Sequence, residues 1–250
     1  MAMAMAVIIM AATATIMRTD MHGRGAGRFL PPLISACVGF AAIAIAVPRI
    51  AAYAAIAPWS SVVPPALAAG AQIEAGPLGD AVHAYERAAV WLPSDGLLQQ
   101  DHARLLMRQG RAPDAIAALR ASLAAAPNRP LPWSLLAYLE DETGASGAAL
   151  APMLRLSRAT GPREAAPVLA RAAVSIHHWA EMSDDLRNAA RVELGYLHDE
   201  PWTQSRFFRL YVEQDFAGRV VMRDAVLTTP DDAARFNRAV RAAADLSAAP

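Results

Sequence analysis

The stretch "HAYERAAVWLPSDG", residues 83–96, decides how this chain is read, because a similar stretch follows it at a fixed distance. Thirty-four residues further on, "AALRASLAAAPNRP", residues 117–130, again has an alanine-rich apolar run closed by a proline. Proline ends a helix because it cannot continue the ladder of backbone hydrogen bonds. The two stretches therefore predict two helices of the same kind, which end at Pro93 and Pro127.

Other landmarks recur with the same period of 34 residues, which is typical of helix-turn-helix units that stack side by side. Small alanines let antiparallel helices pack closely, and glycine relieves the strain of a left-handed helix C-cap. The matches of glycine and proline weigh most, since chance matches of alanine are frequent in this chain. The sets are Ala69, Ala103 and Ala137; Ala81, Ala115 and Ala149; Gly76, Gly110 and Gly144; and Pro93 and Pro127, with Gly161 in third place. Leu106, Leu119, Leu123, Trp133, Leu136, Met153 and Leu156 are expected to fill the core.

Two segments resemble helices of the tetratricopeptide-repeat (TPR) family. "AVHAYERAAVWLP" is similar to the second helix of a unit and "PWSLLAYLEDETG" to the first, and the resemblance covers about residues 62–161. Gln99 and His102 depart from it, because large apolar residues are usual there, and the first helix, "PALAAGAQIEAG", is led by proline. The resemblance implies an all-α fold, with a TPR-like α-solenoid over residues 67–161 and a helical C-terminal cap over 162–250.

The C-terminal region lacks the period but shows helix signals. Ser183 before "DDLRNAARVELGYLH" is a suitable N-cap followed by acidic residues, and Thr229-Pro230-Asp231-Asp232 is a second start signal. Residues 219–229, "RVVMRDAVLTT", are rich in valine but are expected to be helical, because no partner strand is in sight.

An apolar segment before the repeats predicts a membrane anchor over residues 29–57. "FLPPLISACVGFAAIAIAV", residues 29–47, has 19 residues without a charge, close to the roughly 20 that a transmembrane helix needs. Arg18, Arg24 and Arg28 precede it, so the positive-inside rule places the C-terminal part outside the cytoplasm. Arginine supplies all the basic residues other than histidine, which is typical of a high-GC bacterial genome. The expected location is therefore the bacterial inner membrane, single-pass, with a periplasmic domain.

Alternatives stay open at the N-terminus. Residues 1–28 begin with the apolar run "MAMAMAVIIMAATATIM", which is either a first membrane helix or lies upstream of a true start at Met21. Residues 29–57 also fit a cleavable signal, with small-residue sites at Ala52-Tyr53-Ala54 and Ala55-Ile56-Ala57. The proline- and serine-rich residues 58–66 are expected to form a linker.

Charge and cysteine content exclude several classes of function. The formal net charge is zero, with +3 on residues 1–57 and −3 on the remainder, so no basic surface for nucleic acid is expected. Cys37 is the sole cysteine, so the chain cannot form an internal disulfide or a thiolate metal site.

Two clusters carry groups capable of chemistry. His177-His178-Trp179-Ala180-Glu181 contains metal ligands, but adjacent histidines on a helix point about 100° apart, so no metal or other cofactor is expected. Glu140, Asp141 and Glu142 are expected to be a solvated charge run at a helix end. The C-terminal aromatic residues are expected to be core: Trp179, Trp202, Phe207, Phe208, Tyr211 and Phe216.

The resemblance implies a non-enzymatic module that binds a protein partner in a concave groove. The family register places these residues in the groove: Leu97, Gln100, Arg104 and Met107, then Leu131, Ser134, Tyr138 and Asp141. TPR-like proteins with one anchor also accompany machinery for surface polysaccharide and envelope assembly. The alternatives are a glycan-acting helical-superhelix enzyme, which needs Glu140, Glu142, Glu181 or Glu193 buried beside aromatics, and a non-catalytic subunit of a larger membrane complex.

Overall fold

The structure, a computed structural model, describes residues 30–59, 63, 74–227 and 230–247. Within these ranges the chain is all-helical, with eleven α-helices, one short 3-10 helix and no strand. The elements are α2 (Leu30–Ile56), η2 (Ala57–Trp59), α4 (Ala75–Trp91), α5 (Gly96–Arg108), α6 (Ala112–Ala125), α7 (Pro130–Glu142), α8 (Gly147–Thr160), α9 (Ala165–His177), α10 (Asp184–Asp199), α11 (Gln204–Glu213), α12 (Phe216–Val226) and α13 (Pro230–Ser247).

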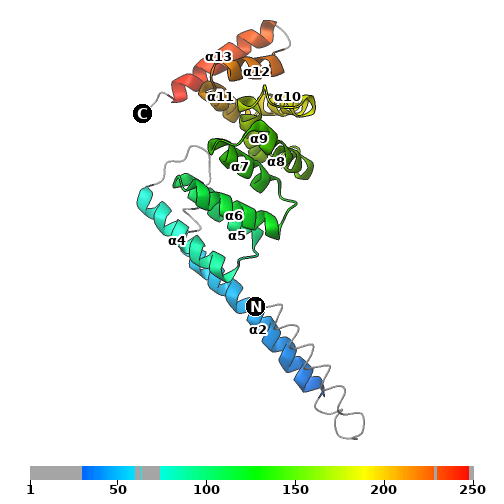
Figure 1. Cartoon of the computed structure of the whole chain (residues 1–250). Helices are drawn as coiled ribbons and strands as arrows, with labels where there is room; N and C mark the ends of the chain where they lie inside the picture. The colour runs from blue at the N-terminus through cyan, green and yellow to red at the C-terminus, as the bar shows by residue number, and fades with distance from the viewer. Residues whose placement is uncertain (1–29, 60–62, 64–73, 228–229, 248–250) are drawn as a thin grey trace.

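Helices that are near in sequence pack against one another, and the chain advances in one direction from α4 to α13 (Figure 1). α5 packs on α6, α6 on α7, and α7 on both α8 and α9. The buried apolar side chains accordingly form three clusters along the chain. The first draws on α2 and α4 to α7, the second on α7 to α10, and the third on α9 to α13.

The turns after α5 and α7 are the same structure at an offset of 34 residues. Gly110 and Gly144 are the described residues with positive φ, at 71° and 90°. Each glycine N–H donates to the carbonyl three residues back, and the next N–H donates to the carbonyl five residues back. This is the Schellman arrangement, and it confirms that glycine relieves a left-handed C-cap at both positions.

The two following helices share a second feature. Ser122 Oγ of α6 donates to the carbonyl of Gly96 at 2.6 Å, and Ser157 Oγ of α8 donates to the carbonyl of Pro130 at 2.8 Å. Gly96 and Pro130 are the first residues of α5 and α7, so each serine joins its helix to the start of the preceding one. The pairs α5/α6 and α7/α8 are therefore built alike.

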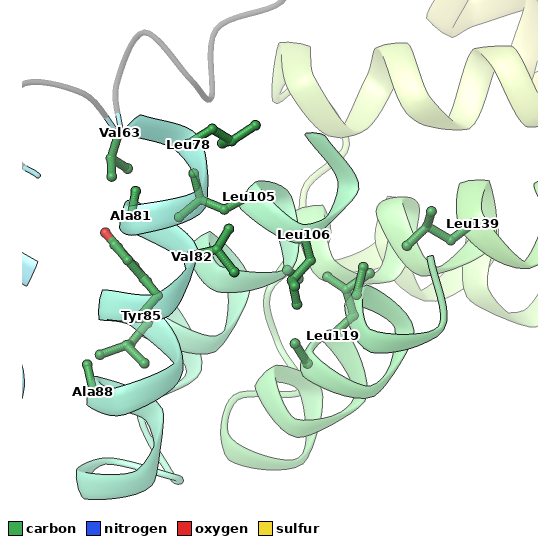
Figure 2. Packing of buried hydrophobic residues seen from close by; sticks show 14 of the residues in the cluster. Val63, Leu78, Ala81, Val82, Tyr85, Ala88, Leu105, Leu106, Leu119 and Leu139 are labelled. Carbon is green, nitrogen blue, oxygen red and sulfur yellow. The ribbon is translucent and has the colours of Figure 1, made fainter. Parts of the chain in front are cut away.

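The period fails at its first member, Gly76. This glycine lies in the first turn of α4 and not in a turn between two helices. The end of α2 packs against α4, and most of the predicted first helix, residues 65–76, lies outside the described residues. Figure 2 shows Val82 directed toward Leu105 and Leu106, with Ala81 and Tyr85 on the other side of α4. α4 is thus buried on two sides, and both α2 and α5 pack against it.

α2 has two different environments along its length. Its N-terminal part stands clear of the other helices (Figure 1), while Ala52 is fully buried and Ile56 packs against the first cluster. Residues 35–59 form the one segment in the described part that is long and apolar enough to cross a membrane. The expectations for residues 1–28, and for most of the 58–66 linker, lie outside the described residues.

Several smaller expectations can be compared directly. Residues 216–226 are helical, and α10 and α13 begin at the predicted signals. Leu106, Leu119, Leu123 and Leu136 are buried, but the prediction for Leu156 is wrong, because this residue is 42% exposed.

Replacing the two turn glycines by alanine is expected to destabilise the chain. Gly110→Ala or Gly144→Ala places a Cβ on a left-handed residue, which should lower the free energy of unfolding by about 1 kcal/mol. Gly76→Ala is the matched control, because this helical glycine has open space around it and alanine favours helix by up to about 1 kcal/mol. Urea unfolding followed by circular dichroism measures all three. Equal effects at 76 and 110 would contradict the assignment of the turns.

Candidate functional site

The eight predicted groove residues do not share one environment. Leu97 is exposed, and Arg104, Met107, Leu131 and Tyr138 are partly buried. Gln100, Ser134 and Asp141 are buried, and Ser134 Oγ donates to the carbonyl of Leu131 at 2.9 Å. The first five therefore keep exposed surface, whereas the last three are interior groups.

Gln99 and His102, the two departures from the family pattern, both lie in α5. Gln99 is buried, and neither ring nitrogen of His102 has a hydrogen-bond partner. Burial lowers the pKa of His102, against a smaller opposite effect of Glu86. Burial therefore favours the neutral form of this imidazole.

The Asp141 carboxylate contacts two histidines, and in the described part of the chain these three residues form the one cluster of converging metal-ligating side chains. Its Oδ1 lies 2.8 Å from Nδ1 of His177 and 2.8 Å from Nε2 of His178. Asp141 is in the last turn of α7, and the histidines are at the end of α9. Packing of α7 on α9 brings these helix ends together.

The expectation that adjacent histidines diverge is wrong here. It assumed that both lie within a helix, but α9 ends at His177, and His178 is its C-cap with φ −98° and ψ 24°. The chain turns at this point, so the two ring centroids are only 4.7 Å apart. A residue pattern alone does not mark the last helical residue, which is why the convergence was missed.

Glu181 completes the surroundings of His178. Its Oε1 lies 3.4 Å from Nδ1 of His178, and its Oε2 accepts the backbone N–H of Gly147 at 2.8 Å. Burial of His178 opposes protonation, but the hydrogen bonds with Asp141 and Glu181 outweigh it, so the pKa of His178 is raised. One imidazole therefore bridges two carboxylates from two segments.

Glu193 is the buried member of the four carboxylates that a glycan-acting enzyme would need. Its Oε1 accepts from Arg171 Nε at 2.7 Å, and its Oε2 from Arg158 Nη2 at 3.0 Å. Arg171 has no exposed surface, and its Nη1 also donates to Ser157 Oγ and to the carbonyl of Gly161. Both oxygens of Glu193 are thus engaged by guanidinium groups, and no aromatic ring lies among these partners.

The other three carboxylates are more accessible. Glu140 pairs with Arg120 at 2.6 Å, and Glu142 and Glu181 are exposed. Of the aromatic residues, Phe207, Phe208 and Tyr211 are core as expected, but the prediction is wrong for Trp202 and Phe216, which are exposed. Trp179 is half-buried beneath the Arg191 guanidinium, whose carbon lies 5.1 Å from the ring centroid.

Comparison of the chain with protein-family models, curated proteins and solved structures finds no match. The resemblance to TPR units therefore stays an expectation, carried by the residues quoted above.

Replacing Glu193 by glutamine is expected to be severely destabilising. The change leaves the buried Arg171 without its counter-charge, and breaking a buried pair typically costs about 3–5 kcal/mol. Arg120→Ala is the control, because it removes an exposed ion pair and should cost less than about 1 kcal/mol. Urea unfolding measures both, and similar losses in the two variants would show that the buried network contributes little.

Proposed function

We propose that the chain is a single-pass protein of the bacterial inner membrane, whose TPR-like helical domain faces the periplasm and holds a protein partner in envelope or exopolysaccharide assembly. The observation that carries this proposal is α2, which is apolar and exposed for most of its length and then packs into the core of the domain. An exposed apolar helix of this length is costly in water and favourable in lipid. The same helix therefore supplies both the anchor and the first packing surface.

The length of α2 fits a bilayer. Leu30 to Pro48 rises about 28 Å at 1.5 Å per residue, close to the roughly 30 Å of a hydrocarbon core. Arg49 follows and is exposed, so its guanidinium can extend into the headgroup layer. Positive residues before the helix favour a cytoplasmic N-terminus and a periplasmic domain.

A hydrogen bond holds the domain close to the point where α2 would leave the lipid. Tyr53 Oη donates to Asp95 Oδ2 at 3.0 Å, four residues beyond Arg49. Asp95 caps α5 directly after α4, so the α4–α5 turn lies beside this part of α2. Val90 and Trp91 at the end of α4 are 80% and 54% exposed. Tryptophan and tyrosine are enriched at bilayer interfaces, and this position suits them.

The partner would bind the part of the predicted groove that keeps exposed surface. Leu97, Leu131 and Tyr138 contribute apolar area, and Arg104 contributes a charge. Such a mixture suits an extended segment of another protein. The two alike helix pairs α5/α6 and α7/α8 support the proposed solenoid, since they repeat one backbone pattern side by side.

Val90 is expected to contact lipid in the assembled protein. We expect a Val90→Cys variant, labelled with an environment-sensitive fluorophore in a Cys37→Ala background, to show blue-shifted emission in nanodiscs and quenching by spin-labelled lipid. Val192→Cys is the matched control, because Val192 is 74% exposed but lies on α10, away from α2. Water-like emission at both positions would contradict a membrane-proximal α4–α5 turn.

Partner binding is expected to be local to the predicted surface. A photoreactive benzoyl-phenylalanine in place of Tyr138 should give a discrete crosslinked adduct in living cells, whereas the same group in place of exposed Trp202 should not. Identical crosslinking at positions 138 and 202 would overturn the proposed binding surface.

The orientation of the domain can be tested separately. A reporter that is active only outside the cytoplasm, fused after Pro250, should be active. An inactive reporter would overturn the proposed orientation.

A further inference from the structure

We propose that Asp141, His177 and His178 form a binding site for a divalent transition-metal ion of the zinc class. The site goes beyond the proposed docking function and does not depend on it. In the described part of the chain, these residues form the one group of three metal-ligating side chains that converge closely enough to share an ion.

The geometry requires little rearrangement. One ligand atom from each residue lies within 4.8 Å of the other two, and both histidine nitrogens are 2.8 Å from Asp141 Oδ1. Two ligands about 2.1 Å from the same ion, at ordinary coordination angles, lie about 3.0–3.4 Å apart. Each histidine nitrogen therefore needs to move only a few tenths of an ångström from the carboxylate oxygen, while the two nitrogens, which lie within 4.8 Å of each other, must come to about 3.4 Å or less.

The donor set selects the class of metal. Two imidazoles and one carboxylate suit zinc and its first-row neighbours, whereas calcium and magnesium prefer oxygen ligands alone. Three protein ligands also leave a position open for water. The side chain of His177 is 68% exposed, so an ion has a route from solvent to this position.

Glu181 and Gly147 hold His178 on the side of its ring that faces away from Asp141. Glu181 contacts Nδ1 of His178, the nitrogen opposite to the one that faces Asp141, and such an outer carboxylate orients a ligating imidazole. Glu181 is itself held by the Gly147 backbone N–H. A Cβ on Gly147 would lie 2.9 Å from Glu181 Oε2 and 3.1 Å from the Cβ of His178, so glycine makes room for this arrangement.

The other two histidine–carboxylate pairs in the described residues lack these features. His83 pairs with Glu86 alone, and His198 with Asp199 alone, each at 3.0 Å or less. Each pair offers one nitrogen ligand and one carboxylate. His83 is a close match for His177 in exposure, at 67%, and so provides a control.

The test uses the full chain in detergent micelles, produced without a polyhistidine tag because such a tag would itself bind Zn²⁺. Titration with Zn²⁺ followed by calorimetry should show saturable binding of one ion per chain, and Co²⁺ should give a visible absorption band that Zn²⁺ displaces. Excess Mg²⁺ or Ca²⁺ should not displace the Co²⁺ band, since neither ion prefers imidazole.

Three variants separate the site from general histidine binding. His177→Ala removes a ligand from the surface and should weaken Zn²⁺ binding at least tenfold without unfolding the chain. Glu181→Gln should weaken binding about 10–100-fold through the orientation of His178. His83→Ala should leave the affinity unchanged.

Absence of saturable Zn²⁺ binding would overturn the proposal. Equal losses in His177→Ala and His83→Ala would also overturn it, because binding would then depend on exposed histidines in general. Circular dichroism spectra that match the unmodified chain exclude unfolding as the cause of a loss.

Discussion

A guanidinium group with no access to water, that of Arg171, links α8, α9 and α10 and, through Ser157, α7. Arg171 of α9 bonds to Glu193 of α10, to the carbonyls of Gly161 and Pro162 that follow α8, and to Ser157. Ser157 in turn holds the first residue of α7. A buried charge is tolerated only where its donors are satisfied, so four helices must keep their relative positions for this group to remain inside. Burial lowers the pKa of Arg171, and Glu193 opposes that effect.

The two turns that contain left-handed glycines could be predicted best, because a single residue determines each of them. Gly110 and Gly144 occupy left-handed positions that other residues avoid, and the sequence period located both. Gly76 matches them in spacing but lies inside α4. The helix that contains Gly76 packs against α2, and this is a tertiary contact that no local pattern contains. The partner of the buried Glu193 could not be predicted either, because Arg171 lies 22 residues away in the sequence and only helix packing brings the two side chains together.

The candidate site illustrates the same limit. Asp141 was predicted as a groove residue and His177 and His178 as divergent neighbours, yet the three side chains meet where α7 and α9 end. Two facts decide this outcome, namely the helix end at His177 and the packing of α7 against α9. Their residue types showed that Asp141 and the two histidines can ligate metals or transfer protons. Nothing in the sequence indicated that Asp141 and His177, which are 36 residues apart, would be in contact.

The packing of α2 against α4 also has a mechanical consequence. An N-terminal helix joined to its domain by a loose tether would leave the domain free to turn, but here Ala52 is buried and Tyr53 is bonded to Asp95. Tilt or rotation of α2 is therefore transmitted to α4 and, through the shared cluster, to the helices that follow. Because α2 and α4 pack together, a change in the orientation of α2 also changes the orientation of α4 and of the helices that pack on it.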